Sequence, residues 1–193
     1  RLQRPIGAVI RVSLKPGAHT CPDHTGHREA QGRQLSEYIL REQLDSIRDE
    51  YDYIILDTPP ALSVLTINAY TASDELIIPM LCEILSLQGI AQLKQTIFAV
   101  QRYYNKDLKV GGILLNKYNP RLTLTRDVED LANVIADQLN TKIYKNRISA
   151  SVCIAEAPAH GESVITYSPR SKVAREYLKF IEELTGVKCD NTK

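Results

Sequence analysis

The chain has 193 residues, 44% of them hydrophobic and 24% charged, which excludes a disordered, collagen-like or miniature disulfide-bonded protein and fits a soluble globular domain. Its formal net charge is +1, so no overall excess of charge indicates nucleic-acid binding or an acidic tail. The total hides an uneven distribution, because residues 34–100 carry 3 basic and 10 acidic side chains, whereas residues 142–193 carry 9 and 6.

Residues 1–34 show no repeating pattern. One apolar segment, residues 7–13, is suited to a strand, whereas residues 15–33 are polar, contain three of the nine glycines and indicate a loop. We therefore expect a leader over residues 1–34, flexible or not native to the domain, followed by a domain over 35–186 and a polar tail over 187–193.

From about residue 35, helical and strand patterns alternate. The predicted strands cover residues 53–56, 75–79, 109–115 and 142–148, and the predicted helices lie around residues 40–51, 62–71, 90–100 and 124–139. A last helix is predicted to start with Ser168 as its N-cap and Pro169 in its first turn, and to end at Gly186. The alternation predicts an α/β fold, doubly wound, with a mainly parallel sheet.

Ligands bind at the carboxyl ends of the strands in such sheets. Asp57 follows directly on a short apolar strand, which is the form of a Walker B element, where a carboxylate holds Mg²⁺ through water beside a nucleotide. An acidic residue at the end of a buried strand is also common for structural reasons alone. The surrounding sequence is therefore needed to distinguish a Walker B aspartate from a structural one.

Four motifs surround or follow this strand. Residues 57–69 have the pattern D-x-P-P-x-L-x-x-L-T-x-N-A, residues 79–83 have P-x-x-x-E, residues 89–93 have G-x-x-Q-L, and residues 156–161 have E-A-P-x-x-G. With these motifs the sequence closely resembles the ParA/Soj family of deviant-Walker ATPases, which segregate plasmids and chromosomes. The family's D-P-x-S-x-x-A start of the last helix corresponds to residues 168–174, with Ser168 in place of the acid. The resemblance covers residues 35 to about 185 and implies a P-loop NTPase-like fold.

The resemblance also implies a nucleotide site. Asp57 would be the Walker B aspartate linked to Mg²⁺, and Thr58 and Pro59 would belong to the loop that senses the γ-phosphate of ATP. Asn116 would read the adenine edge, although an asparagine that forms a turn after a strand is an equal alternative. Glu83 and Asn68 match family positions as well, but a helix cap or a buried hydrogen bond explains them equally.

The family's phosphate-binding loop has no counterpart in these residues. Its K-G-G-x-G-K-[ST] signature needs a Gly-Lys pair, and the 193 residues contain none. We expect that the chain, which begins with Arg, is truncated at the N-terminus relative to the family or has that region replaced. The 193-residue chain is then expected not to hydrolyse ATP appreciably and to bind no Mg-ATP by itself.

DNA binding in the family is non-specific and depends on basic side chains. The candidates here are Lys145, Arg147, Arg170, Lys172 and Arg175. Relatives often have I-P-R-N-V-R-L where this chain has residues 148–154, so two basic positions are replaced by Ala150 and Cys153. Surface charge without a ligand is therefore an equal alternative.

A separate cluster in the leader contains His19, Cys21, His24 and His27, residue types that bind soft and borderline metals. The H-x-C-x₂-H-x₂-H spacing is unusual for a structural zinc site, and a leader without a metal is the alternative. The four cysteines of the chain form no CxxC pair and indicate reduced thiols in a reducing compartment. No run reaches the roughly 20 apolar residues of a membrane-spanning helix.

The leading hypothesis is a partitioning ATPase whose intact form dimerises on Mg-ATP, binds DNA non-specifically and is stimulated by a ParB-type partner. We expect a cytoplasmic, nucleoid-associated protein without membrane attachment. A non-enzymatic module that keeps the fold and binds DNA or a partner is the alternative. A MinD-like or capsule-tyrosine-kinase-like protein is disfavoured, because the tail over residues 185–193 has no apolar face and so is not a basic amphipathic helix, and because the tyrosines are not concentrated at the end.

Overall fold

The computed structural model describes residues 9–13, 37–58 and 63–189, with side chains from residue 37 onward. These residues form two compact units, which we describe one at a time. The amino-terminal unit contains the described residues up to 77 together with residues 92–110. The carboxy-terminal unit contains residues 78–91 and 111–189.

Five strands are hydrogen-bonded in the order β2-β1-β3-β4-β5. Their bounds are β1 Val9–Ser13, β2 Tyr53–Asp57, β3 Glu75–Leu81, β4 Lys109–Tyr118 and β5 Ile148–Ser149. Strand β5 is parallel to β4, whereas β1 is antiparallel to both of its neighbours. The α/β class and the predicted strands at 53–56, 75–79 and 109–115 are confirmed, and β1 is the strand whose direction departs from the parallel pattern.

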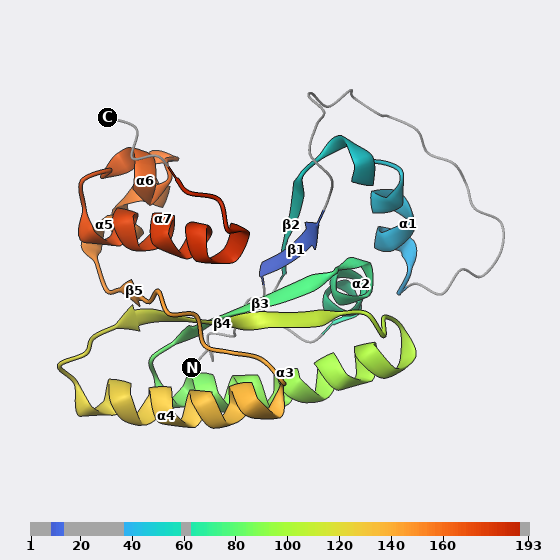
Figure 1. The fold of residues 1–193 in the computed structure, drawn as a ribbon, viewed down its shortest axis with the longest axis horizontal. Coiled ribbons are helices and arrows are strands. Elements are labelled where there is room, and N and C mark those ends of the chain that lie inside the picture. Colours follow the sequence, from blue (N-terminus) through green and yellow to red (C-terminus); the bar gives the residue numbers. More distant parts are fainter. Residues whose placement is uncertain (1–8, 14–36, 59–62, 190–193) are drawn as a thin grey trace. The chain divides into compact units, whose positions relative to one another are not determined.

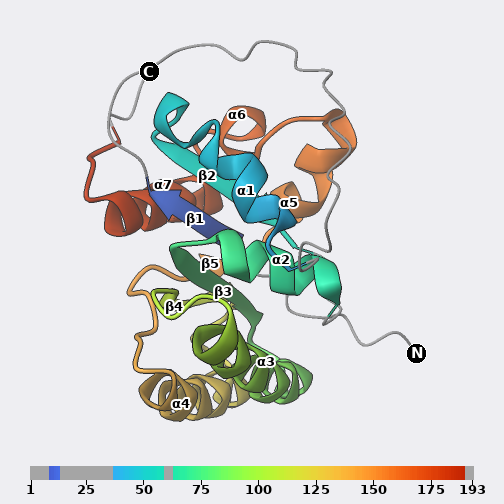
Figure 2. The same ribbon diagram turned by 90° about the vertical axis from the view of Figure 1, so that its right-hand side faces the viewer.

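The helices alternate with the strands as predicted (Figure 1). Their bounds are α1 Ile39–Asp45, α2 Val64–Ala72, α3 Ile84–Tyr103, α4 Thr123–Gln138, α5 Val152–Glu156, α6 Val164–Tyr167 and α7 Lys172–Thr185, with short 3-10 helices at η1 Arg48–Glu50 and η2 Ala157–His160. Helix α1 packs against α2 in the amino-terminal unit, and α5, α6 and α7 cluster in the carboxy-terminal unit (Figures 1 and 2). Within the described residues, no helix is long and apolar enough to cross a bilayer.

The turn between α2 and β3 is fixed from two sides in the amino-terminal unit. From η1, the guanidinium of Arg48 donates to both carboxylate oxygens of Asp74, at 3.2 and 3.3 Å, and to the carbonyl oxygen of Ala72 at 3.2 Å. From the α3–β4 loop, the buried amide of Asn105 donates to the carbonyl oxygens of Tyr70 and Ser73, at 3.1 and 2.7 Å. Since buried carbonyl groups are costly to leave unpaired, these two side chains fix how the loop and η1 meet the start of β3.

Two predictions for the carboxy-terminal unit are wrong in detail. Residues 142–148 do not form a continuous strand: Ile143 makes one isolated bridge to Ile113, and only β5 pairs regularly with β4. The N-cap of α7 is Ser171 rather than Ser168, because the hydroxyl of Ser171 accepts from the backbone N–H of Ala174 at 3.1 Å. Gly186 ends α7 as predicted, with φ of 71°, a left-handed conformation that glycine adopts without strain.

The core of the carboxy-terminal unit includes a close contact between β4 and an aromatic pair. The ring of Tyr144, 1% exposed, meets the ring of Phe180 from α7 edge-on at a centroid distance of 5.0 Å. A Cβ atom added at Gly112 would lie 2.6 Å from Cε2 of Tyr144. Glycine is therefore required at this position by space alone.

We expect Gly112→Ala to lower the free energy of unfolding by about 1–3 kcal/mol, because the added methyl group forces the buried Tyr144 ring to move. The measurement is urea unfolding of the single variant and of the same substitution in a Tyr144→Leu background, which removes the clashing ring atoms. An equal cost in both backgrounds would show that the contact with Tyr144 is not the cause.

Candidate functional site

Asp57 and Thr58 stand at the carboxyl end of β2, in the amino-terminal unit. The carboxylate of Asp57 is exposed and makes no hydrogen bond or ion pair with any described residue, whereas Thr58 is buried. No residue of β2 is fully buried, and Ile55 is 69% exposed. The carboxylate of Asp57 thus has no partner among the described residues and stands at the end of a strand. Pro59, the other residue predicted to line the phosphate-sensing loop, lies outside the described residues.

Asn116 stands near the carboxyl end of β4, in the carboxy-terminal unit, beside an irregularity of the backbone. Asn116 pairs with Ile148 and Tyr118 pairs with Ser149, so Lys117 is an extra residue on β4, a β-bulge. Its φ of 52° is a left-handed conformation that is uncommon for lysine. Bulges and strained backbone occur often beside functional sites, which supports this strand end as one part of a site.

The side chains around the bulge are partly engaged. The amide nitrogen of Asn116 donates to the carbonyl oxygen of Leu114 at 3.1 Å, which leaves its amide oxygen as an acceptor. The ammonium of Lys117 lies 3.6 Å from a carboxylate oxygen of Glu83.

Asn68, which also matches a family position, has a structural role in the amino-terminal unit. It is buried in α2, and its amide oxygen accepts a hydrogen bond from the backbone N–H of Leu40 at 3.4 Å, which ties α2 to α1.

Two glutamates of α7 hold the segment that leads into β5. Glu183 accepts hydrogen bonds from the backbone N–H groups of Lys145 and Asn146, at 2.8 and 3.0 Å. Glu176 accepts from the backbone N–H and the hydroxyl of Ser149, at 2.7 and 2.8 Å. Residues 145–149 therefore run along α7 instead of pairing continuously with β4, which explains why the predicted strand at 142–148 is interrupted.

These hydrogen bonds also set the acidity of the two carboxyl groups. Burial by itself would raise the pKa of Glu176 and Glu183, but the hydrogen bonds outweigh it and hold both pKa values below the usual 4.5. For Glu183 the donors are the backbone of residues 145 and 146 and the Asn146 amide, and for Glu176 they are Ser149 and the ammonium of Lys172. Both carboxylates are charged at neutral pH and act as structural acceptors.

The five basic residues predicted to bind DNA all belong to the carboxy-terminal unit, but they differ in availability. Arg147 is committed: its guanidinium pairs with Glu129 and lies over the ring of Tyr118, 5.2 Å from the centroid. Lys172 contacts a carboxylate oxygen of Glu176 at 3.2 Å and remains largely exposed. The side chains of Lys145, Arg170 and Arg175 are exposed and have no hydrogen-bonding or ionic partner among the described residues.

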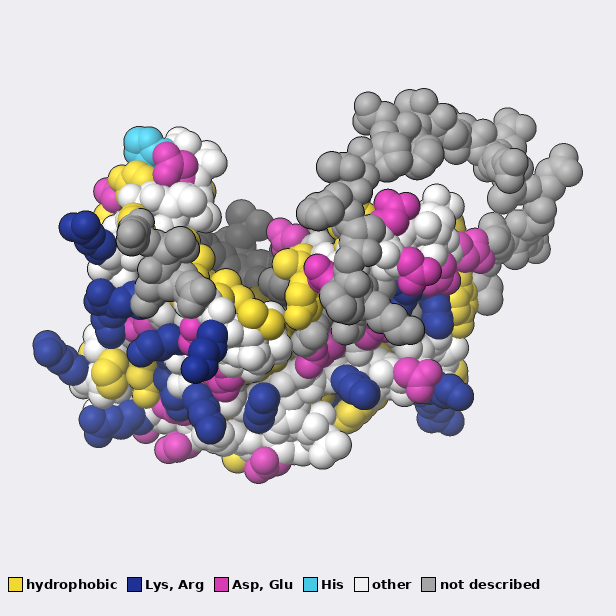
Figure 3. Space-filling model, turned by 45° about the horizontal axis from the view of Figure 1, so that its top comes forward, with side chains coloured by type: hydrophobic (Ala, Val, Ile, Leu, Met, Phe, Trp, Pro, Cys, Tyr) yellow, Lys and Arg dark blue, Asp and Glu magenta, His cyan; other side chains and the backbone are white. Residues whose placement is uncertain are grey.

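We refer to Lys145, Arg170, Lys172 and Arg175 as the α7 basic surface. Lys and Arg side chains gather at the left of Figure 3, where Figure 1 shows α7 and β5. The hydrogen bonds from residues 145–149 to α7 place Lys145 near one end of this helix and Lys172 near the other. The cations are therefore spread along the helix rather than concentrated at one point.

Other candidate groups are less informative. His19, Cys21, His24 and His27 lie outside the described residues, and within the residues that the structure does describe no three His, Cys, Asp or Glu side chains form a group suited to a metal ion. Cys82, Cys153 and Cys189 are free thiols. Burial raises the pKa of Cys82 to about 11, so this thiol is protonated and unreactive at neutral pH.

Comparison with known proteins agrees with the motifs. Residues 25–110 match the model of the AAA domain family AAA_31. The sporulation initiation inhibitor protein Soj of Bacillus subtilis is 41% identical over 151 residues, which cover 78% of this chain and 58% of Soj. The chromosome partitioning protein ParA of Caulobacter vibrioides is 36% identical over 191 residues, which cover 96% of this chain and 70% of ParA. The chain belongs to the ParA/Soj family.

A solved structure extends the likeness to the fold of this family. Cobyrinic acid a,c-diamide synthase from Mycobacterium smegmatis, with bound ATP analog and magnesium, is 29% identical, with a TM-score of 0.57 over 83% of this chain and 59% of that chain. The P-loop NTPase-like fold is thus confirmed. This ParA/Soj chain spans about three fifths of the length of Soj.

Sequence patterns missed two features of this ParA/Soj chain that bear on the site. The bulge at Lys117 has no signal in the sequence, because Asn116 and Lys117 continue the strand pattern without a glycine. The acceptor role of Glu176 and Glu183 has a weak signal, namely two acids seven residues apart on one helix, which places them on one face. Their partners, which are backbone N–H groups, cannot be identified from residue types.

The lowered pKa values of Glu176 and Glu183 predict a loss of stability in acid. A carboxyl group whose pKa is lower in the folded state contributes fully above its unfolded value, near pH 4.5, and loses that contribution as the pH falls through the lower folded value. We expect Glu183→Gln to lower the free energy of unfolding at pH 7 by about 1–3 kcal/mol and to weaken its dependence on pH below 4.5.

Urea unfolding at pH 7 and at acid pH measures both effects. Asp130→Asn is the matched control, because Asp130 is exposed on α4 and has no hydrogen-bonding or ionic partner in the described part of the chain. A pH dependence that is unchanged in Glu183→Gln, or changed equally in the control, would contradict the role of Glu183.

Proposed function

We propose that this chain acts in DNA partitioning as part of a ParA/Soj-type ATPase that binds Mg-ATP, dimerises in that state and binds DNA non-specifically. The supporting observation is the unpartnered carboxylate of Asp57 at the end of β2, in a chain whose relatives include proteins named for chromosome partitioning. The proposal includes stimulation by a ParB-type partner and a cytoplasmic, nucleoid-associated location.

The residues at the end of β2 fit a hydrated magnesium ion. The Asp57 carboxylate is exposed and has no partner among the residues that the structure describes, which suits a cation that keeps most of its water ligands. When bound, the ion would neutralise charge on the phosphates of ATP. Asp57 would hold and orient its water shell.

Asn116 is the proposed contact to the adenine base. Its amide oxygen is available to accept a hydrogen bond, while its amide nitrogen is held by the carbonyl oxygen of Leu114. The bulge at Lys117 shifts the register directly after this residue, and the pairing with β5 continues at Tyr118. The alternative role, a turn-forming asparagine, makes the same local hydrogen bond.

A second candidate is a non-enzymatic module that binds DNA or a partner. The α7 basic surface supports it, because Lys145, Arg170 and Arg175 are exposed and without described partners, and none of them depends on a nucleotide site. The two functions differ in whether DNA binding requires ATP.

We expect the 193-residue chain alone to show no ATP turnover above that of its Asp57→Asn variant, because no glycine-rich loop with a lysine surrounds the phosphates. The test is phosphate release at stoichiometric enzyme concentration with Mg-ATP. Turnover by the chain that disappears in Asp57→Asn would contradict this expectation and would place a complete catalytic site within the 193 residues.

We expect Arg170→Glu and Arg175→Glu each to weaken binding to double-stranded DNA of any sequence and to flatten its dependence on salt concentration, because each removes a cation that releases counterions from phosphate. The measurement is fluorescence anisotropy at several salt concentrations. Arg121→Glu, at an exposed position before α4, is the control for the change in net charge. Equal weakening in all three variants would show that the α7 basic surface is not the DNA-binding site.

A further inference from the structure

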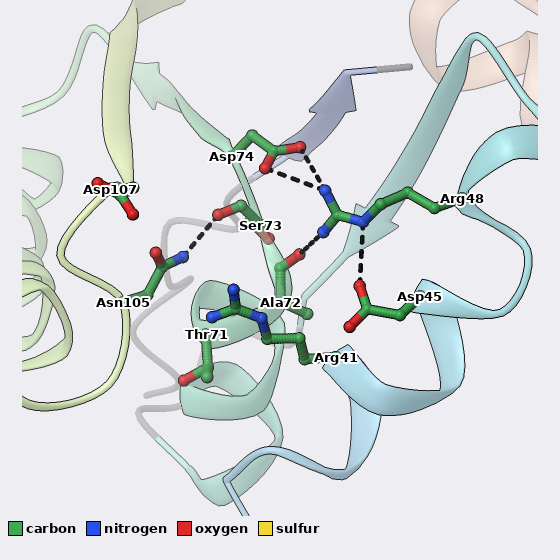
Figure 4. A pocket seen from close by; sticks show the side chains of 9 residues that line it. All are labelled: Arg41, Asp45, Arg48, Thr71, Ala72, Ser73, Asp74, Asn105 and Asp107. Carbon is green, nitrogen blue, oxygen red and sulfur yellow. Dashed lines mark hydrogen bonds and ion pairs between the residues drawn. The ribbon is translucent and has the colours of Figure 1, made fainter. Parts of the chain in front are cut away.

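A hollow of about 230 Å³ lies at the amino-terminal end of β3, within the amino-terminal unit (Figure 4). Helix α1 and η1 supply one wall, the α2–β3 turn supplies the floor, and the α3–β4 loop supplies the other wall. A second hollow of about 310 Å³ shares Arg41, Asn105 and Asp107 with the first and adds Arg102 and Lys106. Together the two hollows approach the size of small-molecule sites.

Hydrogen bonds hold the floor of the first hollow. Arg48 and Asn105 hold the α2–β3 turn with the hydrogen bonds described above, and the backbone N–H of Lys109 donates to the carbonyl oxygen of Asp74 at 3.0 Å. Arg48 is paired within the hollow with two carboxylates, those of Asp74 and Asp45, and the carboxylate of Asp45 lies 3.2 Å from Nε of Arg48. These groups are committed to one another and are not available to a ligand.

Arg41 is not committed in this way. Its guanidinium lies inside the first hollow, beside Thr71, and it makes no hydrogen bond or ion pair with any described residue (Figure 4). Arg41 is also in the first turn of α1, where the partial positive charge of the helix terminus disfavours a cation. The helix terminus therefore does not stabilise this exposed cation.

The second hollow adds cations without acidic partners. Arg102 lies over the ring of Tyr103, 5.3 Å from its centroid, and Lys106 is exposed with no described partner. Among the described residues that line this hollow, Asp107 is the single acid, against the three cations Arg41, Arg102 and Lys106. A concentration of unpaired cations in a hollow attracts an anion, and the planar fork of arginine matches a carboxylate or a phosphate.

We propose that these adjoining hollows bind a small anion with phosphate or carboxylate groups, held by Arg41 with Arg102 and Lys106. Asp107 favours a ligand that also carries a hydrogen-bond donor, such as a hydroxyl group. The site uses neither Asp57, Asn116 nor the α7 basic surface. The proposed anion site is therefore independent of the proposed function, and each can be refuted without the other.

The test is isothermal titration calorimetry of the 193-residue chain with two probes, pyrophosphate for phosphate chemistry and citrate for a hydroxylated carboxylate. We expect at least one probe to bind with a stoichiometry near one, and Arg41→Gln to weaken that probe about tenfold, the effect of losing one charge-assisted hydrogen-bonded contact. Which probe binds decides between the two chemistries.

Arg121→Gln is the matched control, because Arg121 is exposed and does not line either hollow. Circular dichroism and urea unfolding show whether Arg41→Gln is folded, and Arg102→Gln provides a second variant from a different element. Three outcomes would overturn the proposal. They are failure of both probes to bind, equal affinity of the wild-type chain, Arg41→Gln and Arg102→Gln, and a weakening in Arg121→Gln as large as in those two variants. Selective loss in Arg41→Gln and Arg102→Gln supports it.

Discussion

The architecture of the carboxy-terminal unit depends on two carboxylates that bind backbone rather than side chains. Glu176 and Glu183, two turns apart on α7, take the N–H groups of residues 145, 146 and 149. The N–H groups of Lys145 and Asn146, held by Glu183, are not available to a β-ladder, so the strand that begins beside Ile113 is interrupted after Tyr144 and resumes only at β5. The same hydrogen bonds place Lys145 and Lys172 along one helix.

The bulge at Lys117 belongs to the same arrangement. Strand β5 has two residues, and β4 accommodates them by setting Asn116 and Tyr118 opposite Ile148 and Ser149, with Lys117 as the extra residue. The position of Asn116 is therefore tied to the hydrogen bond between Ser149 and Glu176. A proposed nucleotide contact and the α7 basic surface share one structural support, although they serve different ligands.

Patterns in the sequence predicted the elements well where burial determines them. The apolar runs of β3 and β4 and the stripes of α3 and α4 need only the hydrophobic effect and the geometry of a strand or a helix. Strand β2 follows the predicted pattern although none of its residues is fully buried. The cap of α7 was misplaced by three residues because Ser168 and Ser171 are equally good caps by type, and only the bond from Ala174 distinguishes them. The interruption after Tyr144 depends on α7, nearly forty positions later in the chain, and no local pattern contains it.

The candidate site was predictable to a similar extent. The strand-end position of Asp57 follows from the apolar run before it, whereas the commitment of Arg147 to Glu129 follows from tertiary packing. The hollow that contains Arg41 combines α1, the α2–β3 turn and the α3–β4 loop, so its residues carry no common motif.

The antiparallel strand β1 has a consequence for the folding kinetics. It lies between β2 and β3, with Val9 opposite both Asp57 and Ile77, so those two strands do not hydrogen-bond to each other directly. Helix α2 and its flanking strands can form from local sequence, but this part of the sheet closes only when a distant segment inserts between them. Because the loop-closure entropy is lost before the new hydrogen bonds form, insertion of β1 is expected to be a late and slow step in folding.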